Sequence, residues 1–176
     1  MFKRIMSVMM VGILAISLAA CGKAAGNQVS KGPEGELSEI IDQIYEQKKI
    51  DLALQTTKID LADADAFSYN TGLTDATLVK EAAVSEPMIS SQAYSLVLVR
   101  VKDSKDSEAV AKEMMDGINQ SKWICVTADD LKVAGVGDVV LLVMVSSDFS
   151  DTVTTEQVVD AFKTVSNGKL DFTLEK

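Results

Sequence analysis

The sequence predicts an α+β fold, a mostly antiparallel sheet with helices packed on it, and three observations support this prediction. Apolar residues recur at the roughly 3.6-residue period of an amphipathic helix in residues 37–45, 110–118 and 158–165. Residues 94–101 (YSLVLVRV) and 139–145 (VVLLVMV) are rich in β-branched residues, which favour strands. A tight turn signal, Gly137-Asp138, indicates antiparallel pairing of its neighbours. The expected order is α-β-β-α-β-β-β-α-β.

The first helix is expected to open at Pro33 and Glu34 and to place Leu37 on its apolar face. Residues 50–76 leave two interpretations open, a short helix or a strand followed by a loop. Within them, residues 69–72 (YNTG) are a turn signal.

Two strands should follow, over residues 77–84 and 94–101, and the second is the stronger because it is rich in β-branched and aromatic residues. The next helix can be capped by Asp103 or Ser104. Met114 belongs to the apolar face of that helix.

Short strands are expected at residues 123–126 and 131–136. Residues 139–145 are apolar at every position, so they should form a central strand covered on both faces, one of them by the helix around Met114. A last helix begins at Thr154 with a capping-box pattern, and a strand over residues 170–174 closes the domain.

The N-terminus carries a pattern of its own. Lys3 and Arg4 precede an apolar run of residues 5–18, which is too short to span a membrane. The run ends in Leu18-Ala19-Ala20-Cys21, which resembles the lipobox of bacterial lipoproteins. The alternatives are an uncleaved anchor helix and an ordinary secretory signal.

The lipobox resemblance implies a division of the chain into three parts. Residues 1–20 would be a lipoprotein signal peptide, and residues 21–35 a flexible tether rich in Gly, Ala and polar residues. Residues 36–176 would form a single domain. A diacylglyceryl group on Cys21, with acyl chains such as palmitate, would hold that domain on the extracytoplasmic face of the cell membrane.

Composition excludes several kinds of function. The formal net charge is −9, and removal of Lys3 and Arg4 with the signal makes it −9 − 2 = −11. A chain with this negative charge would be repelled by the phosphates of nucleic acid. We therefore expect no nucleic-acid partner. The sequence has no histidine, which excludes Ser-His-Asp triads and imidazole metal ligands.

The two cysteines have different expected roles. Cys21 is assigned to the lipid, which leaves Cys125 without a disulfide partner in the mature chain. Because Cys125 lies in the apolar run of residues 123–126, we expect it to be a buried, inert thiol rather than a reactive one.

Several segments together resemble a family of small lipoproteins from Gram-positive, clostridial-type bacteria, catalogued as domain of unknown function 4358. They are the lipobox, ELSEIIDQIYEQ, YNTGL at residues 69–73, Glu86-Pro87-Met88, and SLVLVRVKDSKDSEAVAKEM. The resemblance covers about residues 36–165. It implies a lipid-anchored extracytoplasmic domain and assigns no functional residue except the lipidated Cys21.

Three motifs resemble known sites and are interpreted as structural. Asp60, Asp63 and Asp65 fail the EF-hand pattern, so we expect a solvated acidic loop. Residues 166–169 match Ser-x-x-Lys, but the serine lies at a helix end, where the acyl-enzyme arrangement does not form. Residues 135–138 (GVGD) lack the further residues of a phosphate loop, so we expect a hairpin.

We therefore expect a non-enzymatic binding or envelope-accessory domain, with no catalytic residue, metal or cofactor. Its partners would be the membrane, through the lipid on Cys21, and an envelope protein or small ligand. The alternatives are a cell-envelope hydrolase using Asp/Glu or Ser-Lys chemistry, and a small solute-binding lipoprotein. A deep pocket with converging carboxylates would favour the enzyme, and an exposed apolar patch would favour a partner surface.

Overall fold

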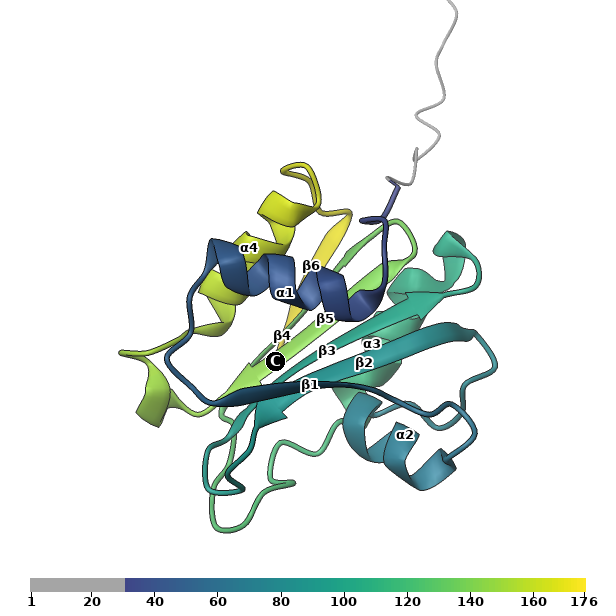
Figure 1. Ribbon diagram of the computed structural model, residues 1–176. Helices are drawn as coiled ribbons and strands as arrows, with labels where there is room; N and C mark the ends of the chain where they lie inside the picture. Colours follow the sequence, from purple (N-terminus) through teal and green to yellow (C-terminus); the bar gives the residue numbers. More distant parts are fainter. Residues whose placement is uncertain (1–30) are drawn as a thin grey trace, which may run out of the picture.

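The computed structural model describes residues 31–176, which form a mixed α+β domain (Figure 1). The predicted signal segment and Cys21 lie outside the described residues. The described part contains a six-stranded antiparallel sheet in the order β1-β2-β3-β5-β4-β6. Its elements are α1 (Leu37–Gln47), β1 (Leu54–Lys58), α2 (Ala64–Thr71), β2 (Val79–Pro87), β3 (Tyr94–Val101), α3 (Ser107–Gly117), β4 (Asp130–Val136), β5 (Val139–Val145), α4 (Thr155–Val165) and β6 (Phe172–Glu175), with short 3₁₀ turns at Ser104–Asp106 and Ser147–Phe149.

Two crossovers set the layers of the domain. β3 and β4 are parallel, with β5 between them, and α3 connects them; β5 and β6 are parallel, with β4 between them, and α4 connects them. Both connections move in the same direction across the sheet but start from antiparallel strands. Right-handed crossovers, the strongly preferred form, therefore require α3 and α4 on opposite faces. They lie there, and α1 shares the face of α4 (Figure 1).

β5 is the central strand that its composition predicted, and this prediction is confirmed. All of its residues are buried, and it pairs with β3 on one side and β4 on the other. Leu142 and its alternate neighbours pack with Met114 of α3, whereas Leu141 and Val143 pack with α1 and α4. Its uniform hydrophobicity therefore reflects two cores, one on each face of the sheet.

Local sequence signals account for most helix ends. The capping box of Thr154 and Gln157 is present at the start of α4, as predicted. The YNTG segment, predicted as a turn, is instead the end of α2, where Gly72 adopts a left-handed conformation with φ 77°. A Cβ on Gly72 would lie 2.5 Å from the backbone nitrogen of Ile118, so the glycine also allows α2 to end close against the end of α3.

The structure corrects two expectations about strands. Residues 123–126 form no strand, and Cys125 has φ 61°, a conformation that no strand continues. They belong to a loop closed at its base, where Ala128 N–H donates to the Gln120 carbonyl and Gln120 Nε2 donates to the Ala128 carbonyl. The remaining strand comes instead from residues 50–76, which contain both structures left open, strand β1 and helix α2.

The first helix begins later than expected, at Leu37 rather than at Pro33. Gly35 has φ 101°, a conformation outside the helical region, so the helix cannot include it. Glu36 then caps α1 in a reciprocal pair with Glu39. Residues 32–35 are therefore free to make other contacts, and those contacts define the first candidate site.

Candidate functional site

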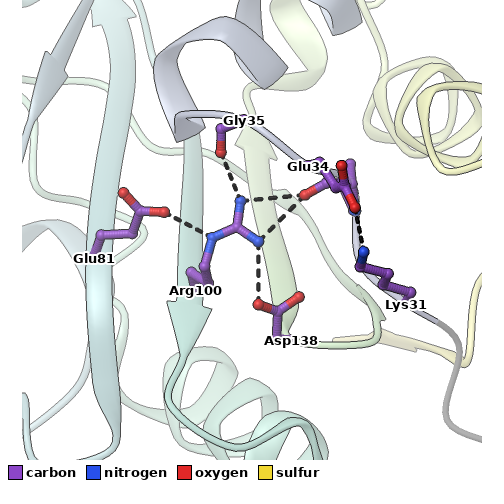
Figure 2. Close-up of polar contacts among 7 residues, drawn as sticks. Lys31, Glu34, Gly35, Glu81, Arg100 and Asp138 are labelled. Atoms are coloured by element: carbon purple, nitrogen blue, oxygen red, sulfur yellow. Dashed lines mark hydrogen bonds and ion pairs between the residues drawn. The ribbon is translucent and has the colours of Figure 1, made fainter.

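Arg100 of β3 connects the N-terminal segment to the sheet (Figure 2). Its Nε donates to Glu81 Oε1 of β2 at 2.7 Å, and Nη1 donates to Asp138 Oδ2 in the β4–β5 turn at 3.1 Å. Both Nη atoms lie 3.2 Å from the Pro33 carbonyl, and Nη2 donates to the Gly35 carbonyl at 2.9 Å. One guanidinium therefore joins three parts of the chain.

The charge of Arg100 is stabilised where burial would otherwise oppose it. The side chain is 8% exposed, while those of Glu81 and Asp138 are 21% and 34% exposed. Burial acts to lower the pKa of Arg100, but hydrogen bonds and charge attraction from Glu81 and Asp138 outweigh it and raise the pKa. The partly exposed carboxylates keep contact with water while the cation is enclosed.

Gly32 seats the same segment against the sheet. A Cβ at this position would lie 2.4 Å from Asp138 Oδ1 and 2.9 Å from the Val136 carbonyl, so only glycine fits without a shift. Lys31, the preceding residue, forms an exposed ion pair with Glu34 (Figure 2). Of the residues that the sequence assigned to the tether, Gly32 and Pro33 are thus buried, and Gly32 lies against the β4–β5 turn, whereas Glu34 and Gly35 are exposed.

Lys122 forms a second buried cation site at the opposite ends of β2 and β3. Its side chain has 0% exposure, and its Nζ lies 2.5 Å from Glu86 Oε1 and 3.4 Å from Ser95 Oγ. The same Nζ lies 5.0 Å and 5.4 Å from the ring centroids of Tyr69 and Trp123, within the range of cation–π contacts. Burial lowers the pKa of Lys122, and attraction to Glu86 offsets this only in part.

A buried lysine with a lowered pKa can act as a nucleophile in enzymes. Lys122 does not present that arrangement, because its side chain is fully enclosed and leaves no approach for a substrate. Tyr69 Oη also donates to the Lys122 backbone carbonyl at 3.0 Å. The contacts indicate that Lys122 holds the loop of residues 120–128 against the sheet.

The tip of this loop overturns the expectation for Cys125. The cysteine is exposed, not buried, because residues 123–126 form a loop instead of pairing in the sheet, and only Trp123 and Val126 of these keep partial contact with the core. The neighbouring Ile124 is 69% exposed, and Met88 and Ile89 in the β2–β3 loop are 71% and 55% exposed. Local hydrophobicity predicted burial here, but no strand partner is available to provide it.

The predicted acidic segment is divided between two local structural roles. Asp63 Oδ1 accepts the Ala66 N–H at the start of α2, and Asp60 Oδ1 accepts the Ala62 N–H. Asp65 lies in the first turn of α2. In residues 31–176, no group of three or more potential metal-binding side chains comes together.

The Ser-x-x-Lys motif lies at the end of α4. Ser166 is buried at the C-cap, Gly168 has φ 76°, and Lys169 is exposed, so the motif does not place serine and lysine on one helical face. The GVGD segment forms the β4–β5 turn as expected, with Gly137 at φ 57°.

Sequence reasoning missed both buried cations. A signal for Arg100 exists, because it is the single charged residue in the apolar run YSLVLVRV, and a buried charge needs partners. No comparable signal marks Lys122, since its partners Glu86 and Tyr69 are distant in sequence and its own neighbours are irregular in structure.

No protein-family model matches this chain, and no curated protein or solved structure matches it either. Among the helices of residues 31–176, none is long and apolar enough to span a bilayer.

Proposed function

We propose that the chain is a lipid-anchored extracytoplasmic lipoprotein whose domain has a non-enzymatic binding or envelope-accessory role. The observation that supports this most directly is the Arg100 junction, which fixes Pro33 and Gly35 to the sheet shortly after the lipobox at Cys21.

The junction fixes the place on the domain to which such an anchor would be connected. Nine residues lie between Cys21 and Lys31, and the ten steps from Cys21 to Lys31, at about 3.5 Å each in an extended chain, reach at most about 35 Å. The chain enters the domain at the end of the sheet where Arg100 of β3 meets Asp138 of the β4–β5 turn. The loops that contain Met88 and Ile124 lie at the other end. Those loops would therefore lie at the end of the domain farther from the point of attachment.

The environments of the buried cations support a binding role rather than catalysis. Arg100 donates hydrogen bonds to two carboxylates and two backbone carbonyls, and Lys122 is enclosed by Glu86 and two aromatic rings. Both arrangements hold irregular segments in place. Neither presents a reactive group to a substrate.

Metabolic labelling with an alkyne fatty acid tests the anchor. The parent chain should incorporate the label and remain with membranes, whereas Cys21→Ala should lose the label and accumulate as uncleaved precursor. Cys125→Ala is the matched control, because it removes the other cysteine and should keep the label. Label retained in Cys21→Ala would refute the proposal.

A further inference from the structure

β1 forms one edge of the sheet, and its outer side is arranged to accept another strand (Figure 1). It pairs with β2 in continuous register from Leu54 to Lys58, with no bulge. The Ala53 carbonyl accepts the Met88 N–H, and the Ile59 N–H donates to the Ala82 carbonyl. Because antiparallel pairing alternates along a strand, the N–H and C=O groups of Leu54, Thr56 and Lys58 point outward.

A cavity of about 500 Å³ lies where β1 ends. It is lined by Lys58, Ile59, Asp60, Leu61, Lys80 and Glu81. A second cavity of about 250 Å³ adjoins it and shares Lys58 and Glu81, and α1 contributes Leu37 to its lining. An extended chain added to β1 would run beside both cavities.

The charged side chains that line the larger cavity differ in whether they have an ion-pair partner. Glu81 is bound to the Arg100 guanidinium, which compensates its charge, whereas Asp60 accepts only the backbone N–H of Ala62 and keeps its charge. Lys58 and Lys80 form no ion pair with any residue of the described chain. In a chain with a formal charge of −9, this edge therefore offers two cations without ion pairs against the one uncompensated carboxylate of Asp60, and Ile59 and Leu61 also line the cavity.

We propose that this edge binds an acidic, extended segment of another protein. The main chain of that segment would pair with the outward groups of Leu54, Thr56 and Lys58. One of its carboxylate side chains would lie between Lys58 and Lys80. The inference deepens the proposed binding role and rests on it, because it names the class of partner.

The opposite edge of the sheet provides an internal comparison. At β6, Lys132 Nζ lies 2.9 Å from Glu156 Oε2 and 3.1 Å from Glu175 Oε2, so the cation there is already paired twice. β6 is also shorter, with four residues against five in β1. An acidic partner should therefore prefer β1.

The test uses the full chain in detergent and a fluorescein-labelled blocked peptide, acetyl-Ser-Thr-Val-Glu-Val-Thr-Ser-amide, whose binding is followed by fluorescence anisotropy. The same peptide with Lys in place of Glu should bind more weakly. Lys58→Gln with Lys80→Gln should weaken binding of the Glu peptide about fivefold, the effect of two partly exposed ion pairs. The matched control, Lys49→Gln with Lys169→Gln, makes the same charge change at exposed sites elsewhere and should leave binding unchanged.

The contribution of the strand edge is tested at Thr56. Thr56→Pro removes an outward N–H while leaving the bonds of β1 to β2, and proline is tolerated at such edge positions. It should abolish binding, whereas Thr56→Ala, which keeps the N–H and removes the same side chain, should bind normally. Amide hydrogen exchange at Leu54, Thr56 and Lys58 should slow when the peptide binds.

Three outcomes would overturn the inference. Equal binding of the Glu and Lys peptides would remove the acidic partner. Binding of glutarate alone with the affinity of the peptide, unchanged by Thr56→Pro, would indicate a small-carboxylate site instead. Self-association lost in Thr56→Pro, with no peptide binding, would assign the edge to a second copy. A chain that is lipidated through Cys21 but binds no peptide refutes only this inference, not the lipoprotein assignment.

Discussion

The same two strands, β2 and β3, have a buried cation at each end, and the two cations differ in how their charge is stabilised. Arg100 lies near the end of β3 with Glu81 of β2, and Lys122 meets Glu86 and Ser95 at the opposite ends of these strands. Each cation holds an irregular segment against the sheet. Arg100 holds residues 33–35, and Lys122 holds the loop of residues 120–128.

The difference lies in how many partners each cation has. The planar guanidinium of Arg100 bonds four groups in three parts of the chain, and its pKa is raised. The Lys122 ammonium has one carboxylate, one hydroxyl at 3.4 Å and two rings, and burial lowers its pKa. The junction near the N-terminus is thus held by directional bonds. The loop at the far end is held mainly by packing around a poorly solvated charge.

Arg100→Met should give the largest effect. It leaves the Pro33 and Gly35 carbonyls without their donor and places Glu81 and Asp138 near each other without a cation. Removal of one partner from a buried ion pair costs about 3–5 kcal/mol, and partial exposure of the carboxylates reduces this to about 2–4 kcal/mol. Urea unfolding of the purified chain measures the loss.

A matched control separates this effect from the loss of any paired cation. Lys132→Met also removes a cation with two carboxylates, but Glu156 and Glu175 are 65% and 77% exposed, so the cost should stay below about 1 kcal/mol. Cleavage by a Glu-specific protease at Glu34 should accelerate in Arg100→Met alone. Equal losses in both variants would show that the junction depends on charge and not on the guanidinium fork.

Lys122→Met should cost far less, within about 1 kcal/mol of the parent at pH 7. Methionine keeps contact with the rings of Tyr69 and Trp123 and removes the burial cost of the ammonium. Only one carboxylate loses its cation, whereas Arg100→Met leaves two carboxylates and two carbonyls without a partner. Because the native pKa of Lys122 is lowered, the unfolded chain binds more protons in the window just below the usual lysine pKa. The parent should therefore gain stability as pH rises through that window, and Lys122→Met should flatten the gain.

A cost as large as that of Arg100→Met would break the comparison, because it would show that the Glu86 ion pair holds the loop. Denaturant unfolding at a series of pH values measures both the cost and the slope. Glu86→Gln provides the complementary variant, since it leaves Lys122 buried without its carboxylate and should cost more than Lys122→Met.

Tyr94, at the same end of β3 as Ser95, should produce a smaller effect of opposite sign. It is fully buried, and its Oη lies 3.3 Å from that of Tyr45. Burial raises the pKa of Tyr94 well above its usual value, so the native state keeps the proton where the unfolded chain loses it. Stability should fall above about pH 10, the unfolded value.

Tyr94→Phe should flatten this alkaline fall and cost about 0.5–1 kcal/mol at neutral pH through the lost hydrogen bond. Tyr69→Phe is the comparison, because Tyr69 is 51% exposed and should change the alkaline slope less. Unfolding followed between pH 8 and pH 11 distinguishes them. An unchanged slope in Tyr94→Phe would show that other groups cause the alkaline loss.

Periodicity and turn chemistry predicted the elements that are marked by a pattern within their own sequence. The helix faces, the capping box at Thr154 and the central strand β5 follow from apolar spacing that tertiary packing reinforces. The prediction failed at residues 123–126, where four apolar residues have strand propensity but no strand partner. β-Propensity describes fit to a sheet, and the sheet supplied no place for them.

The candidate sites were less predictable than the fold because their contacts are long-range. Arg100 reaches Pro33 across 67 positions of sequence, and Lys122 meets the ring of Tyr69 from another part of the chain. A lone charge in an apolar strand signals that a partner exists but not which one. The open edge of β1 was hidden for a similar reason, since residues 50–76 were ambiguous between helix and strand.

Cys125 should give the smallest change in stability and the sharpest test of the free loop tip. Its thiol is exposed, and it has φ 61°, where glycine carries no Cβ penalty and a β-branched residue does. Cys125→Gly should therefore unfold within about 0.5 kcal/mol of the parent, and Cys125→Val about 1 kcal/mol below it. Because the loop is fixed at its base by Lys122 and by the Gln120–Ala128 bonds, a thiol reagent should label Cys125 in the native chain, before unfolding. Lys122→Met should not slow that labelling. A native chain that resists the reagent until it is denatured would show that the loop folds back over the cysteine. The loop at Lys122 would then be fixed along its whole length, as the N-terminal segment is at Arg100.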